Sequence, residues 1–287
     1  MPLHLDPESV QPHREGLGQP RPALPRTLGS LLADTVERPL VGMWLCSGSS
    51  VMAEIAAGSG LDWLLIDAEH SPLSLAQMQM QLQAIAAYPI TPAIRVPSAD
   101  PVTIKQVLDL GVQNIVVPMV SDADQASAAV AAARYAPAGV RGVGSALARS
   151  GRWGRVPGYL ENANDYVSVT VQIETAEGVS NAEEIMQVEG VDAVFVGPSD
   201  LAASMGMIGR QTHPDVVAAV MSVVDRGRAL GRPVGVNAFD PQAAQDYIAG
   251  GVRFILVGAD VTLVARGSEA LAQKWVPEVG VSEAAAY

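Results

Sequence analysis

The sequence predicts a single (β/α)8 barrel, and two features of the 287-residue chain carry that prediction. First, short apolar runs alternate eight times with longer amphipathic runs, over roughly the length that such a barrel occupies, about 240 residues. Second, several apolar runs stop abruptly at ionisable residues, of which residues 63–70 are the clearest case. Buried parallel strands end in this way where they open onto a pocket. A doubly wound sheet would usually contain fewer strands.

The expected strands are short runs rich in Val, Ile and Leu, often bounded by Gly, Pro or Asp. They cover residues 41–46, 63–67, 91–96, 114–118, 167–174, 193–197, 233–238 and 254–258. Between them lie amphipathic patterns, several of which begin at Ser, Asp or Pro, as capped helices do. The expected helices cover residues 50–58, 73–87, 101–110, 123–135, 176–187, 214–229, 241–249 and 261–275.

Two segments do not fit the alternating pattern. The first residues of the chain are polar and are interrupted by Pro2, Pro7, Pro12, Pro20, Pro22 and Pro25. Such composition predicts a flexible arm, and we place it at residues 1–35, with the barrel domain at 36–287. Residues 137–166 form a connection longer than most, and we expect this segment to fold over the mouth of the barrel.

Composition excludes several classes of function. The chain has 30 acidic and 18 basic residues, which disfavours nucleic acid as a partner. No apolar stretch reaches the roughly 18 residues of a membrane span, and the N-terminal segment lacks the apolar region of a signal peptide. We therefore expect a cytoplasmic protein without a membrane partner. The single cysteine, Cys46, excludes an internal disulfide, and we expect it to be a small buried hydrophobe.

Two carboxylates at neighbouring strand ends point to a metal. Glu174 closes the fifth expected strand and Asp200 follows the sixth, so both side chains should reach the same pocket. Two such oxygen donors suit a hard divalent cation such as Mg²⁺ or Mn²⁺, whereas zinc favours more nitrogen or sulfur. Taken singly, Asp200 could instead cap a helix and Glu174 could pair with a loop arginine. Taken together, the two positions favour a metal site.

Other polar residues follow the same strand ends. His70 comes directly after the second strand, close to Asp67 and Glu69, and a histidine oriented by a carboxylate can act as a general base. Arg95 ends the third strand, where its charge needs a carboxylate partner or an anionic substrate. Gln172 lies two residues before Glu174 and so shares its face of the strand.

The position of the lysines argues against a Schiff-base mechanism. Lys105 and Lys274 are the two lysines of the chain, and both fall within expected helices. A Schiff-base aldolase needs a lysine that projects into the pocket. Stabilisation of a carbanion would then depend on a metal and on arginine.

With these residues in place, the chain resembles the HpcH/HpaI aldolase family of metal-dependent class II pyruvate aldolases. The similarity begins near Val41 and continues to the last helix. Its most specific motifs are WLLIDAEH at residues 63–70, AGVRGVGSALAR at 138–149, VQIET at 171–175 and VFVGPSDL at 194–201.

The resemblance implies roles for the residues already singled out. Glu174 and Asp200 would bind Mg²⁺, Mn²⁺ or Co²⁺, His70 would be the base, and Arg95 would stabilise the transition state. Gln172 and the segment Ser199-Asp200 would hold the 2-oxo acid. The family also assigns a carboxylate on the third expected helix, here Asp109, to raising the basicity of the histidine. Since that helix runs away from the mouth, Asp109 would act from a neighbouring subunit, and otherwise Asp67 would orient His70.

The resemblance further implies a reaction and an assembly. A 4-hydroxy-2-oxo acid would be cleaved to an aldehyde and pyruvate, or a related 2-oxo acid, through a metal-stabilised enolate. The last helix would be exchanged between two subunits, with dimers assembled into a homohexamer. Two alternatives stay open: a lyase acting on a coenzyme A ester, as in the citrate lyase β and malyl-CoA lyase types, and a barrel that binds an organic acid without turnover.

Overall fold

The computed structural model describes residues 24–35 and 37–276, and it confirms the predicted barrel. Eight parallel strands pair in sequence order and close into a ring. They are β1 (Leu40–Leu45), β2 (Trp63–Asp67), β3 (Thr91–Arg95), β4 (Asn114–Val117), β5 (Ser168–Ile173), β6 (Ala193–Val196), β7 (Val234–Asn237) and β8 (Phe254–Ala259). Each expected strand agrees with an observed one to within about two residues, the usual uncertainty of such boundaries.

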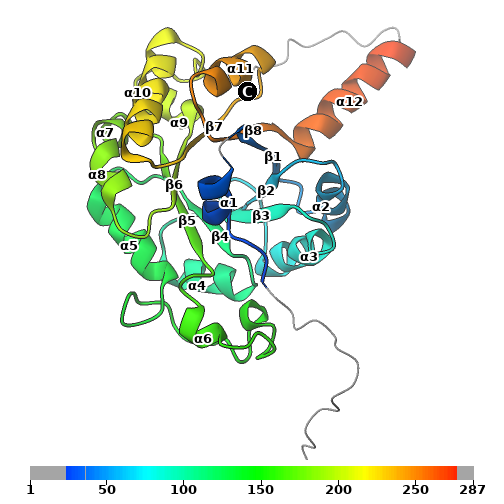
Figure 1. The fold of residues 1–287 in the computed structure, drawn as a ribbon. Helices are drawn as coiled ribbons and strands as arrows, with labels where there is room; N and C mark the ends of the chain where they lie inside the picture. The colour runs from blue at the N-terminus through cyan, green and yellow to red at the C-terminus, as the bar shows by residue number, and fades with distance from the viewer. Residues whose placement is uncertain (1–23, 36, 277–287) are drawn as a thin grey trace, which may run out of the picture.

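Helices follow the strands and surround the barrel (Figure 1). The helices are α1 (Leu28–Asp34), α2 (Ser50–Ala57), α3 (Leu75–Ile85), α4 (Pro101–Asp109), α5 (Ala123–Ala133), α6 (Tyr159–Asn162), α7 (Ala176–Ser180), α8 (Ala182–Gln187), α9 (Pro198–Ser204), α10 (Pro214–Leu230), α11 (Pro241–Ala249) and α12 (Asp260–Trp275). The helix expected at 176–187 is divided at Asn181, whose side-chain amide donates to the carbonyl of Ser121. Among the described residues, no helix combines the length and the apolar character that a membrane span requires.

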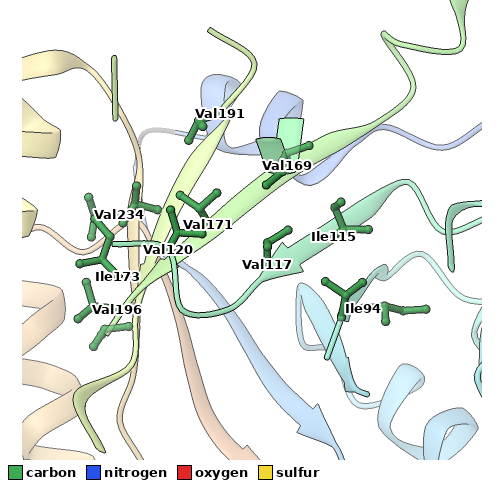
Figure 2. Packing of buried hydrophobic residues seen from close by; sticks show 14 of the residues in the cluster. Ile94, Ile115, Val117, Val120, Val169, Val171, Ile173, Val191, Val196 and Val234 are labelled. Carbon is green, nitrogen blue, oxygen red and sulfur yellow. The ribbon is translucent and has the colours of Figure 1, made fainter. Parts of the chain in front are cut away.

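Alternate residues of each strand enter two separate apolar clusters. The outer cluster contains strand residues such as Val117, Val171 and Val196, which Figure 2 shows, and residues of the surrounding helices. The inner cluster fills the barrel itself, where the rings of Trp63, Phe195 and Phe254 meet edge to face or tilted, 5.6 to 6.4 Å apart. Because these rings come from β2, β6 and β8, on different sides of the barrel, their side chains fill its interior as a packed core.

The end of the barrel opposite the mouth is closed by α1. The backbone N–H of Leu28 donates to Asn114 Oδ1 at 2.6 Å and that of Gly29 to Ser168 Oγ at 3.1 Å, at the starts of β4 and β5. Leu28 and Leu32 are buried in the inner cluster, and Figure 1 shows α1 across the centre of the barrel.

The expected limit of the N-terminal arm therefore differs from the structure. Placing that limit at residue 35 was wrong for residues 28–34, because their apolar side chains fill the open end of the barrel. The proline-rich part of the expected arm, residues 1–23, lies outside the described residues, as do residues 277–287.

The segment 137–166 does not cover the mouth, so that expectation was wrong. Arg149 donates to the backbone carbonyls of Leu110 and Leu82, near the ends of α4 and α3, and α6 lies beyond α4 in Figure 1. The physical reason is topological. A connection from a helix to the next strand emerges at the N-terminal end of the barrel, whereas the mouth is built from the connections that follow the strands.

Helix α12 is joined to its own barrel at Asp260, which accepts from the backbone N–H groups of Cys46 and Ser47, and is otherwise largely exposed. It projects away from the other elements in Figure 1, and Asp260 is its one buried residue. Its apolar side chains lie open to solvent, with Leu263 63% and Leu271 62% exposed. An amphipathic helix usually gains its stability by burying such a face.

Candidate active site

Arg95 is fixed at the mouth by contacts on three sides. Its Nε donates to Asp67 Oδ1 at 2.9 Å, and its Nη2 lies 2.9 Å from Asp67 Oδ2. Its Nη1 lies 3.0 Å from Glu69 Oε2, and its Cζ stands 4.3 Å from the centre of the Trp44 ring. A guanidinium held by a two-point carboxylate contact and an aromatic face has little freedom to move. Arg95 therefore presents a fixed positive charge to the mouth.

Glu174 follows β5 and is buried at the same mouth. Its Oε1 accepts from the backbone N–H of Met119 at 2.8 Å, and its Oε2 accepts from Gln172 Nε2 at 3.0 Å. The pKa of Glu174 is raised to about 7, chiefly by burial and also by the negative charges of Asp200 and Glu69, against the lowering effects of the Met119 N–H and Arg95. A carboxylate that is this poorly compensated favours a cation beside it.

The backbone around Glu174 is shaped to leave room for its carboxylate. A Cβ on Gly197 would stand 2.5 Å from Glu174 Oε2, so only glycine allows this approach. Met119 presents its N–H from a left-handed conformation, with φ of 58°, which is uncommon for a residue with a side chain.

Asp200 lies in the first turn of α9, next to Ser199, and both are exposed. The N-cap of α9 is Gly197 and no side chain caps the helix, so Asp200 does not have the capping role considered above. Similarly, Glu174 makes no ion pair with an arginine in the part of the chain that the structure describes. Neither carboxylate therefore has the alternative role considered for it above, a helix cap for Asp200 or an arginine ion pair for Glu174.

His70 stands at the rim with its side chain 65% exposed. The nearest carboxylate to its ring is Glu69, whose Oε2 lies 3.8 Å from His70 Nε2. Burial raises the pKa of Glu69, partly offset by Arg95 and His70. Asp67 does not reach the histidine ring: its Oδ1 accepts from Arg95 and from the backbone N–H groups of Glu69 and His70.

Asp109 lies far along α4, at the end of the helix that leads away from the mouth. It accepts from Nη2 of Arg141 at 2.9 Å, and the Arg141 side chain is buried against the Tyr135 ring. Within one chain, the structure therefore does not bring Asp109 to His70.

Two residues of the mouth were not predicted. Asn237 ends β7 and accepts from the indole N–H of Trp44 at 2.7 Å. A polar residue at the end of an expected strand, the signal that marked Gln172, would have identified it. Met119 acts through its backbone, so its side chain gives no such signal.

Cys46 is partly buried, and burial raises the pKa of its thiol to about 11, which agrees with a protonated, unreactive residue.

The donor set fits a hard cation that retains water and substrate ligands. Among residues 24–35 and 37–276, no group of three or more His, Cys, Asp or Glu side chains is placed to enclose a metal. Glu174 and Asp200 would leave several positions open, which is the usual arrangement for Mg²⁺ at a substrate site. Within the described part of the chain, the buried Gln172 Oε1 has no hydrogen-bond partner, so it too is open to a ligand.

Comparison with known proteins gives consistent matches along the chain. The family model for HpcH/HpaI aldolase/citrate lyase matches residues 40–267. The chain is 50% identical over 247 residues to 4-hydroxy-2-oxo-heptane-1,7-dioate aldolase from Salmonella dublin, covering 86% of this chain and 94% of that one.

Solved structures extend the similarity to the fold. An HpcH/HpaI aldolase/citrate lyase family protein from Burkholderia cenocepacia J2315 has 41% identity and a TM-score of 0.82, over 86% of this chain and 98% of that chain. An HpcH/HpaI aldolase from Desulfitobacterium hafniense DCB-2 has 26% identity and a TM-score of 0.79, over 88% and 98% of the two chains.

The family match and the named aldolase relatives, together with the barrel, identify an enzyme of the carbon–carbon lyase class. The chain belongs to the HpcH/HpaI aldolase/citrate lyase family, so the family predicted from its motifs is confirmed.

Proposed function

We propose that this enzyme is a divalent-metal-dependent aldolase that cleaves or forms 4-hydroxy-2-oxo acids, with pyruvate or a related 2-oxo acid and an aldehyde as the other reactants. The observation that carries the proposal is that Glu174 and Arg95, which do not contact each other as an ion pair, both lie at the mouth of the barrel. A buried carboxylate whose pKa is raised to about 7 lies beside Asp200 and across from a fixed guanidinium. This arrangement provides one place for a cation and one for negative charge that develops on a substrate.

Glu174 and Asp200 would hold the cation, which we expect to be Mg²⁺, Mn²⁺ or Co²⁺. When bound, such a cation draws electron density from the carboxylate and keto oxygens of a 2-oxo acid and so lowers the energy of the enolate. Gln172 and the Ser199-Asp200 segment would hold the substrate. The backbone N–H groups of Ser199 and Asp200 lie in the first turn of α9, where an N–H has no partner within the helix, and they suit a carboxylate.

The remaining steps are assigned to His70 and Arg95. His70 accepts the proton of the C4 hydroxyl group, and the C3–C4 bond then breaks to release an aldehyde. The electron pair of that bond becomes the enolate of the 2-oxo acid, and the Arg95 charge stabilises it until C3 is protonated. The rigid support from Asp67 and Trp44 means that Arg95 needs no rearrangement during the reaction.

The site would be completed by a second copy of the chain. The Asp109 side chain is 28% exposed and lies away from the His70 of its own chain. We therefore assign to Asp109 the role of raising the basicity of the histidine in a neighbouring subunit. The open apolar face of α12, which includes Leu263 and Leu271, supports the exchange of this helix between two subunits, within a hexamer built from dimers. Such an exchange would bury the face that the single chain leaves in water.

A pyruvate-release assay tests the proposed function. A panel of 4-hydroxy-2-oxo acids is incubated with the enzyme, first with a chelator and then with each divalent metal restored. We expect pyruvate from at least one substrate, with loss in chelator and recovery with metal. Absence of pyruvate from every substrate would contradict the proposal, and activity without a metal would contradict its mechanism.

A further inference from the structure

A hollow of about 590 Å³ lies beside the proposed 2-oxo acid site. Ser199 and Asn237 both line it, and both belong to the mouth of the barrel, at the start of α9 and at the end of β7. Since Ser199 is in the segment assigned to the 2-oxo acid, the hollow adjoins the reacting atoms. Pockets of this size accommodate several non-hydrogen atoms of a small ligand.

The hydrogen bond that Asn237 already makes determines which of its side-chain atoms remain available to a ligand in the hollow. The Trp44 indole N–H is a donor only, and it lies 2.7 Å from Asn237 Oδ1. The amide oxygen of Asn237 therefore accepts from Trp44, and the two N–H donors of Nδ2 remain available. Among the described residues, the contact with Trp44 is the one hydrogen bond of the Asn237 side chain.

The charge of the hollow limits what it can accept. Asp240 is the charged side chain among its described lining residues, and it is used as the N-cap of α11, accepting from the Ala243 N–H at 2.8 Å. No lysine, arginine or histidine of the described chain lines the hollow. A carboxylate or phosphate group would be desolvated here without a cation. A neutral hydroxyl group, in contrast, can accept from Asn237 Nδ2 and donate to Ser199 Oγ.

We propose that Asn237 is a specificity-determining residue, which selects substrates that carry an uncharged hydroxyl group next to the reacting carbon. This inference rests on the proposed aldolase function. The hydroxyl group belongs either to C3 of the 2-oxo acid or to the carbon beside the aldehyde, and both present the same chemistry to the amide. Through Trp44, which lies against Arg95, the same residue also positions the guanidinium.

The test uses two pairs of substrates that differ by a methyl or a hydroxyl group at one position. The first pair is 2-oxobutanoate and 3-hydroxypyruvate with a fixed aldehyde, and the second is propanal and glycolaldehyde with a fixed 2-oxo acid. For the wild type, we expect kcat/KM to favour the hydroxylated member of one pair by about tenfold, the effect of one hydrogen bond. The pair that shows the preference identifies which reactant carries the hydroxyl group.

Variants of Asn237 separate its two roles. Asn237→Leu removes the amide, and Asn237→Asp keeps an acceptor for Trp44 but lacks the Nδ2 donors, so both should lose the preference. Asn162→Leu is the matched control, since Asn162 lies in α6 at the other end of the barrel, and it should keep the preference. Thermal melting of each variant verifies that it is folded.

The outcomes distinguish the two proposals. An active wild type that shows no preference in either pair overturns the inference, as does a preference that survives in Asn237→Leu. A wild type that turns over none of the substrates overturns the proposed function as well.

Discussion

Arg95 is joined to Asp67 by two parallel contacts of 2.9 Å, which hold the guanidinium in one orientation at the mouth of the barrel. Asp67 ends β2 and Arg95 ends β3, and the two residues are partners in the parallel register of these strands. The pair is therefore set by the sheet itself, and not by a mobile loop. A catalytic charge held in this way is oriented before the substrate arrives.

Replacing Arg95 by lysine should lower kcat by about 10²–10³, because lysine cannot form the two-point contact with Asp67. Metal affinity, measured by calorimetry with Mn²⁺, should change little. The control is Arg38→Lys, which alters a similar two-point contact with Asp62 at the other end of the barrel. Full activity in Arg95→Lys would remove the role assigned to this residue.

Replacing Gly197 by alanine should weaken metal binding by about tenfold or more, because the new Cβ would displace the Glu174 carboxylate from its position. Gly58→Ala is the control, since its Cβ, at the end of α2 away from the mouth, would meet its neighbours only at ordinary distances of 3.4 to 3.9 Å. Titration with Mn²⁺ followed by electron paramagnetic resonance measures both affinities. Equal affinities in the two variants would show that the contact between Gly197 and Glu174 does not matter for the metal.

The raised pKa of Glu174 predicts how the metal-free protein depends on pH. The folded state keeps this proton up to about pH 7, whereas the unfolded chain loses it near the ordinary value of 4.5. The stability that the neutral form provides is thus present below pH 4.5 and is lost as the pH rises through 7. Metal binding, which needs the charged form, should strengthen over the same interval.

Melting temperatures in chelator, at pH 5 and pH 8, test this dependence. The wild type should lose stability relative to Glu174→Gln between the two values, because glutamine does not titrate. A difference between the two proteins that stays constant with pH would contradict the assignment.

Mixing of inactive subunits tests the position of Asp109. His70→Ala and Asp109→Asn should each be poorly active alone. If Asp109 serves the histidine of a neighbouring subunit, unfolding and refolding the two together should restore roughly a quarter of the sites by random assortment. No recovery in mixed oligomers would place both residues in the same chain or remove Asp109 from the site.

Helix α12 should be required for assembly. Leu263→Asp combined with Leu271→Asp places charge on its open apolar face and should give smaller oligomers, measured by light scattering after size-exclusion chromatography. Gln273→Asp adds charge to the same exposed helix at a polar position and should leave the assembly intact. An unchanged oligomer in the double variant would show that this face is not an interface.

The strands and their order were predictable because apolar runs, such as residues 63–67, are bounded by clear turn and charge signals. The same signal placed Glu174, Arg95 and His70 at one mouth. Helix α1 was missed, because its short apolar pattern follows proline-rich sequence and its role depends on the open end of a barrel formed by later residues.

Other features of the site depend on contacts that a linear pattern does not contain. The support of Glu174 by the Met119 backbone and the close approach of Gly197 arise from the closed barrel. The orientation of Arg95 by Trp44 and Asn237 joins β1, β3 and β7, which are far apart in sequence. The motifs therefore predicted which residues gather at the mouth, but not how each is held.

Exchange of the methyl protons of pyruvate with D2O, followed by NMR without any aldehyde, tests the central claim most directly. Glu174, Asp200 and Arg95 are proposed to support formation of the enolate. This step can be measured before the aldehyde partner is identified. We expect exchange that requires a divalent metal, stops in chelator, and is lost in Glu174→Gln. The account would be contradicted by exchange that persists in chelator or in Glu174→Gln. It would also be contradicted by an enzyme that releases pyruvate but shows no exchange.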